Sequence, residues 1–171
     1  MSVVRIEKEG QNIRLIYPVL FTLILMVFFH LPSPLMVLSK LAPMTPVIFT
    51  YYWSVQRPSV ASLISVFIIA LFHDIWSENV VGITPLLVIL VRLAIVPNQE
   101  VFRVAPFSLR WLAFSIVLLG LMLVKWFLIS GIYLAWISYR DLVFQSIISV
   151  ALYPLFNHFY AMIDRRMIMR S

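Results

Sequence analysis

Long stretches of this chain contain no charged residue. Leu15–Ser39 runs for 25 residues and Leu142–Ile163 for 22 residues without an Asp, Glu, Lys or Arg. A helix needs about 20 apolar residues to cross a hydrocarbon core of roughly 30 Å, so each stretch is long enough to span a membrane. Charged residues make up 12% of the 171 residues, and the mean hydropathy is +1.01. These features predict an integral membrane protein with a single polytopic domain over residues 1–171.

The other apolar runs are shorter or interrupted. Trp111–Tyr139 is broken only by Lys125, whereas Leu41–Gln56 and Pro58–His73 are uncharged runs of 16 residues, about 24 Å of helix each. We therefore expect an all-α integral membrane protein, a compact bundle of about six transmembrane helices. The fourth of them is alternatively a re-entrant segment. The expected spans are residues 15–38, 41–56, 58–74, 80–96, 111–133 and 142–163.

The basic residues predict the orientation. With six spans, ten of the 13 Lys and Arg residues fall on the side of both termini and two on the other, with Lys125 inside the fifth span. Because Lys and Arg are enriched on the cytoplasmic side, both termini are expected in the cytoplasm. The first apolar run is expected to stay as a helix, since Ala42-Pro43 makes a poor signal-peptide cleavage site. Pro97–Arg110 is expected to be a cytoplasmic loop, and Pro58 to lie in the first turn of the third span.

The sequence lacks the usual motifs of catalysis and cofactor binding. It contains no cysteine, no G-x-S-x-G, no H-E-x-x-H and no glycine-rich phosphate loop. We expect no enzymatic activity, no catalytic residues, no cofactor and no metal site. The net charge of +6 is spread between apolar runs, which favours contact with anionic lipid over binding of nucleic acid.

Two ionisable residues near or inside the expected spans need an explanation, because such groups are costly in hydrocarbon. Asp74 ends the third span. It is expected either to sit in the headgroup layer, capping a neighbouring helix or bonding water, or to make a partner contact or order the outer turn. Lys125 is expected to extend its long side chain outward to the interface; a buried pair with Asp74 or Glu78 is the alternative.

The last span carries a polar and aromatic stripe. At 100° per residue, five side chains fall within an arc of about 80°. They are Gln145, Ser149, Tyr153, Phe156 and Tyr160. Such a stripe avoids lipid, so it is expected to hold helices together within the bundle or, alternatively, to bind another protein. Arg165 and Arg166 follow it and are expected to contact a partner or the anionic leaflet.

The order of these features resembles the rod shape-determining protein MreD family. The motifs that carry the resemblance are Pro43 and Pro46 followed by Tyr52-Trp53, Arg57-Pro58, Asp74, Gly82, Tyr153-Pro154 and Arg165-Arg166. They are spread over most of the chain and are densest between residues 43 and 95.

The resemblance implies a multi-pass subunit of the bacterial inner membrane, without enzymatic activity, that belongs to the cell-elongation machinery. Its partners would be MreC and, through MreC, MreB, RodA and a penicillin-binding transpeptidase. The role would be to scaffold or regulate side-wall peptidoglycan synthesis. The family fold is similar to the substrate-binding subunit of energy-coupling-factor vitamin transporters, so a small-molecule transporter subunit is the alternative function. A small channel is a third reading, although only the last span has a polar stripe.

Overall fold

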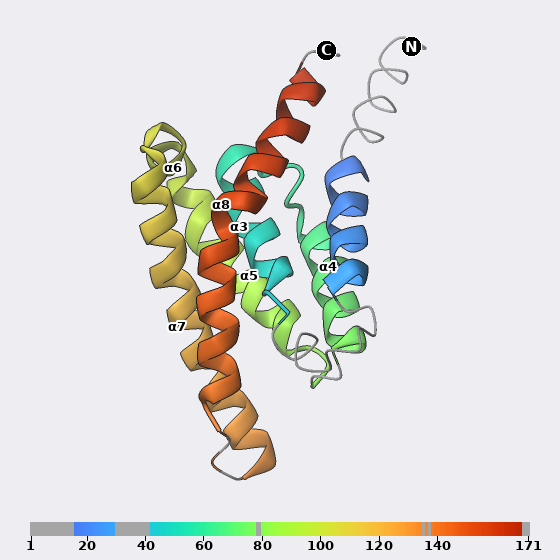
Figure 1. Cartoon of the computed structure of the whole chain (residues 1–171), viewed down its shortest axis with the longest axis vertical. Coiled ribbons are helices and arrows are strands. Elements are labelled where there is room, and N and C mark those ends of the chain that lie inside the picture. Colours follow the sequence, from blue (N-terminus) through green and yellow to red (C-terminus); the bar gives the residue numbers. More distant parts are fainter. Residues whose placement is uncertain (1–15, 30–41, 78–79, 135, 137, 169–171) are drawn as a thin grey trace.

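The computed structural model describes residues 16–29, 42–77, 80–134, 136 and 138–168, and every regular element in these ranges is helical. The predicted all-α class is confirmed for this part of the chain. The first helix within the described residues is Ile16–Phe29. It is followed by α3 (Thr45–Gln56), α4 (Leu63–Trp76), α5 (Ile83–Ile95), the 3-10 turn η1 (Val96–Asn98), α6 (Gln99–Val104), α7 (Phe107–Tyr133) and α8 (Arg140–Ile168). The helices form one bundle, shown in Figure 1.

Helix α3 occupies the middle of the bundle. Every side chain from Thr45 to Val55 is buried, and α3 packs against α4, α5, α6 and α8. Its buried aromatic residues, among them Tyr51 and Trp53, form the centre of the core. A helix that is buried all round has to be enclosed by other helices, so the remaining elements form a shell around α3.

Three continuous helical segments are long and apolar enough to cross a membrane. They are Ile83–Val104, Phe107–Tyr133 and Arg140–Arg166, while Ile16–Phe29 and Leu63–Trp76 are shorter apolar helices. The protein is therefore a helical membrane protein, and the count of six spans stays a prediction. The fourth expected span continues through η1 and α6, which gives it 22 residues.

Pro58 does not lie in the first turn of a helix, which corrects the start expected for the third span. Residues 58–61 form a turn, and α4 begins five residues later at Leu63. The side chain of Ser62 accepts a hydrogen bond of 3.2 Å from the backbone N–H of Ser65. A serine hydroxyl satisfies a free N–H at a helix start, which a proline ring cannot do, and this explains the later boundary.

The expected loop Pro97–Arg110 is also corrected, because most of it is helical. Pro97 lies in the first turn of η1, α6 follows, and Pro106 precedes the first residue of α7. Prolines are tolerated at these positions because the N–H groups at a helix start have no partner within the helix. They mark helix starts here rather than an irregular loop.

Candidate functional site

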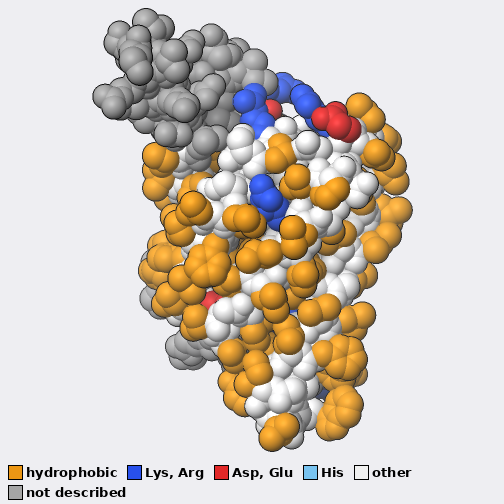
Figure 2. All heavy atoms as spheres, turned by 180° about the vertical axis from the view of Figure 1, so that it is seen from behind, with side chains coloured by type: hydrophobic (Ala, Val, Ile, Leu, Met, Phe, Trp, Pro, Cys, Tyr) orange, Lys and Arg blue, Asp and Glu red, His pale blue; other side chains and the backbone are white. Residues whose placement is uncertain are grey.

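Two ends of the bundle carry the polar side chains, and we name them after the predicted orientation. The outer end is where α4 finishes and α5 begins. The inner end is where α3 and α8 finish. Hydrophobic side chains cover most of the surface between the ends, and the Lys and Arg side chains visible in Figure 2 gather mainly near one end.

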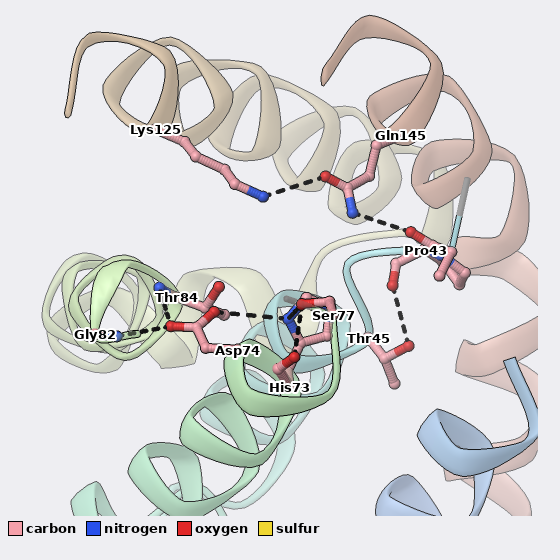
Figure 3. Close-up of polar contacts among 10 residues, drawn as sticks. Pro43, Thr45, His73, Asp74, Ser77, Gly82, Thr84, Lys125 and Gln145 are labelled. Carbon is pink, nitrogen blue, oxygen red and sulfur yellow. Dashed lines mark hydrogen bonds and ion pairs between the residues drawn. The ribbon is translucent and has the colours of Figure 1, made fainter. Parts of the chain in front are cut away.

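At the outer end Asp74 joins α4 to α5. Its side chain is fully buried, and Oδ2 accepts hydrogen bonds from the backbone N–H of Gly82 at 2.9 Å and of Thr84 at 3.1 Å (Figure 3). Gly82 has a φ of 104°, a left-handed conformation that glycine adopts without steric cost. The carboxylate therefore caps the N-terminus of α5, where the helix dipole favours a negative charge.

His73 and Ser77 lie next to this cap. The hydroxyl of Ser77 donates to the carbonyl oxygen of His73 at 2.6 Å, and the Nδ1 atom of His73 lies 3.8 Å from Oδ1 of Asp74. His73 and Asp74 are both buried. Side chains at the end of α4 thus stabilise the last turn of α4 and, through Asp74, the first turn of α5.

Lys125 is buried, so the expectation that it extends to the interface is wrong. Its residue is 3% exposed, and Nζ donates to Oε1 of Gln145 at 3.4 Å. In Figure 3 the side chain extends toward Gln145, and the charge of Asp74 also acts on it electrostatically. Lys125 lies on the face of α7 that packs into the bundle, and eight further residues of α7 lie between it and the end of that helix. The lysine side chain is too short to reach past these eight residues to the interface.

Gln145 and Ser149 fasten the segment that leads into α3. The Nε2 group of Gln145 donates to the carbonyl of Ala42 at 3.0 Å, and the Ser149 hydroxyl accepts from the N–H of Met44 at 2.9 Å. Ser149 also donates to the carbonyl of Gln145 at 2.7 Å. Residues 42–44 are not helical, and such backbone at membrane depth has to find partners within the protein.

The rest of the stripe on α8 is turned into the bundle as well. The ring of Tyr153 stacks on Phe114 of α7 with centroids 4.3 Å apart, and the Tyr160 hydroxyl lies 3.0 Å from that of Thr22. Phe156 is buried beside them. Pro154 lies inside α8, and the helix continues on both sides of it. The five stripe residues therefore pack within this chain.

At the inner end the motif Arg57-Pro58 meets the end of α8. Nε of Arg57 forms an ion pair of 2.5 Å with Oδ1 of Asp164. The guanidinium of Arg92 donates to the carbonyl of Ala61. Arg165 and Arg166 are exposed in the last turns of α8. The inner end thus has polar contacts within the chain and, at Arg165 and Arg166, exposed basic side chains.

The described residues hold no group of three His, Asp or Glu side chains suited to a metal ion. Several of their polar groups join helices to one another. The sequence matches the family model described as rod shape-determining protein MreD over residues 9–163. The chain belongs to the MreD family. Searches of curated proteins and of solved structures found no match.

Membership of the MreD family confirms the resemblance inferred from the motifs and indicates a role in determining rod cell shape. Of the motif residues, Asp74 and Gly82 meet in one hydrogen bond, whereas Arg57 pairs with Asp164, about a hundred residues away in the chain. The pairing of Arg57 with Asp164 was missed, since charge alone does not indicate which acidic residue lies nearby.

Proposed function

We propose that this MreD protein is a non-enzymatic subunit of the cell-elongation complex in the bacterial inner membrane. It scaffolds or regulates side-wall peptidoglycan synthesis and so maintains rod shape. Its partners are MreC and, through MreC, MreB, RodA and a penicillin-binding transpeptidase. The observation that carries this proposal is the family match over residues 9–163, in a chain whose described part is a bundle of apolar helices.

The hydrogen bonding at the outer end supports a scaffold over a small-molecule transporter subunit. A binding site needs polar groups that converge on a cavity with their hydrogen-bonding capacity available. Both polar atoms of the Gln145 amide have partners within the chain, and so does the hydroxyl of Ser149. The Oδ2 atom of Asp74 already accepts two backbone N–H groups. These polar groups therefore stabilise the fold through bonds within the chain.

The partner contacts are therefore expected on exposed surfaces rather than on the stripe of α8. At the inner end Arg165 and Arg166 are exposed at the end of the helix that anchors α3. They are suited to an acidic surface of an elongation protein, and they are also suited to anionic lipid. If the two arginines bind an elongation protein, charge reversal should remove that protein. If they bind lipid, charge reversal should only weaken the contact with the membrane.

The test is affinity purification of the full chain in mild detergent, followed by identification of the proteins that co-elute. We expect elongation proteins, and we expect depletion of the chain to round the cells. Co-elution of an ATPase transporter module, together with tight binding of a vitamin, would overturn the proposal.

A charge-reversal pair sharpens the same test. The double variant Arg165→Glu/Arg166→Glu is expected to reduce co-elution of an elongation protein at unchanged membrane abundance. The control is Arg103→Glu, which reverses one exposed arginine on α6 and is compared with the single variant Arg166→Glu, so that both change the net charge equally. An equal loss in both variants would assign the effect to net charge and not to the tail.

A further inference from the structure

Helices α7 and α8 continue past the outer end of the bundle as a hairpin (Figure 1). On α7 the last buried residue is Lys125, and on α8 the first is Gln145. None of the described residues from 126 to 144 is buried. We call the described residues in this range, 126–134, 136 and 138–144, the outer hairpin; its only charged residues are Arg140 and Asp141, which are exposed at the start of α8. Leu128, Ile129 and Leu142 are partly buried and pack against the edge of the core, and the other described hydrophobic residues of the hairpin lie outside the core.

The distance by which the outer hairpin projects follows from the helical rise. Figure 1 shows α7 continuing well past the end of α4, and Lys125 is the last buried residue of α7. Helix α7 continues from Lys125 to Tyr133, eight residues or about 12 Å. The end of α7 therefore lies about two fifths of a hydrocarbon thickness beyond the last buried residue of that helix.

The surface of the outer hairpin has the chemistry of a membrane interface. The sequence has no charged residue between Lys125 and Arg140. Leu134 is 93% exposed and Trp136 is 85% exposed, and the exposed Tyr133 and Tyr139 lie close to them in the chain. Tryptophan and tyrosine favour the headgroup layer, where the ring meets lipid and the polar atom meets water. Projecting freely into water, the same side chains would form an unusually apolar tip.

Helix α4 presents a much shorter apolar surface to lipid. Its 14 residues span about 21 Å, with exposed apolar side chains from Leu63 to Trp76. The exposed Trp76 lies at its outer end. The 27 residues of α7 span about 40 Å, also with exposed apolar side chains along their length. The apolar surface that the protein presents to lipid is therefore longer along α7 than along α4.

We propose that the outer hairpin binds phospholipid of the outer leaflet, so that the protein holds the bilayer at two thicknesses, thinner beside α4 than beside α7 and α8. A bilayer adapts its local thickness to the apolar length beside it, at a small cost per ångström. A flat bilayer would either leave the outer hairpin in water or bury the polar end of α4 in hydrocarbon. Both cost more than local thinning, because one exposes apolar side chains and the other desolvates polar groups.

The chain offers a direct test because it contains no cysteine. Single cysteines replace Ile75 at the outer end of α4 and Tyr133 at the end of α7, in variants Ile75→Cys and Tyr133→Cys; both side chains are exposed. Each carries a nitroxide label in vesicles of phosphatidylethanolamine and phosphatidylglycerol. Power saturation with oxygen and a water-soluble nickel chelate then gives the depth of each label. Leu119→Cys, exposed on α7 well before the outer hairpin, serves as the deep reference.

We expect the two labels to lie at the same interfacial depth, within about one helical turn of 5 Å. A label at Tyr133 that the nickel chelate reaches as freely as in water would overturn the proposal and leave the outer hairpin free for a protein. A label at Ile75 about 12 Å deeper than that at Tyr133 would overturn it too, because the bilayer would then be flat. The pair Trp76→Cys and Trp136→Cys repeats the comparison if a first variant does not assemble.

Discussion

The indole nitrogen of Trp111 lies 3.0 Å from the carbonyl oxygen of Val150 and donates a hydrogen bond to it. Val150 precedes Pro154 by four residues, so its carbonyl is the one that the proline leaves without a donor inside α8. A side chain of α7 thus completes the backbone bonding of α8. The proline stays inside the helix because a neighbouring helix supplies the missing donor.

This relationship predicts a coupling between Trp111 and Pro154. Trp111→Phe removes the donor and is expected to lower the free energy of unfolding by about 0.5–1.5 kcal/mol. In the Pro154→Ala background the helix supplies its own N–H to Val150, so the same substitution is expected to cost less. A double-mutant cycle from unfolding in detergent micelles measures the difference. Strict additivity of the two substitutions would contradict the assignment.

A second prediction concerns the charges of Asp74 and Lys125. Lys125→Met keeps the shape of the side chain but leaves the buried carboxylate without its nearby cation. It is expected to destabilise the protein by about 1–3 kcal/mol, because the buried Oε1 of Gln145 also loses its donor. In the Asp74→Asn background, where the cap retains an acceptor oxygen, Lys125→Met is expected to cost less, because only the hydrogen bond to Gln145 is then lost. The measurement is again a double-mutant cycle, and an undiminished loss in the Asn background would show that the two charges do not interact.

A third prediction concerns the polar stripe on α8. Gln145→Leu leaves the carbonyl of Ala42 and the ammonium of Lys125 without their partner, so it is expected to destabilise the fold by about 1–3 kcal/mol. The exposed position Ile147→Leu on the same helix is the matched control and is expected to change little. Unfolding in micelles measures both. A Gln145→Leu variant of normal stability that loses a partner protein would instead make the stripe an interface.

A fourth prediction concerns topology. Reporter fusions after Ser171 and within Pro97–Arg110 are both expected to report the cytoplasm, because the basic residues gather on that side. A fusion within residues 77–79 is expected to report the periplasm. Opposite locations for the loop and the C-terminus would show that the span count of six is wrong.

The positions of most helices could be predicted from the spacing of charges, because a long run without charged residues is typical of a helix within a membrane. Which face of a helix turns inward could be predicted for α8, where polar side chains recur on one side, but not for α7. Helix α7 is apolar on all sides, so nothing in its sequence indicates that Lys125 faces the bundle. The turn at Pro58 and the helices within Pro97–Arg110 were missed for a local reason: a proline marks a helix start as readily as a loop.

The candidate site could be predicted in part. Asp74 was recognisable as an ionisable residue at the end of a span, and a helix cap was among its expected uses. Its partners, Gly82 and Thr84, depend on how closely α5 follows α4, which a single sequence does not define. The non-helical backbone at residues 42–44 was hidden for the same reason, since its partners lie on α8, about a hundred residues away.

The complete burial of α3 has a consequence for how the protein is made. The ribosome produces α3 well before α8, whose Gln145 and Ser149 bond the backbone leading into α3 and whose tyrosines close its core. Until α8 arrives, the N–H of Met44 and the carbonyl of Ala42 lack the side-chain partners that they have in the folded bundle. The burial of α3 is therefore complete only after α8 has been synthesised and has packed against it.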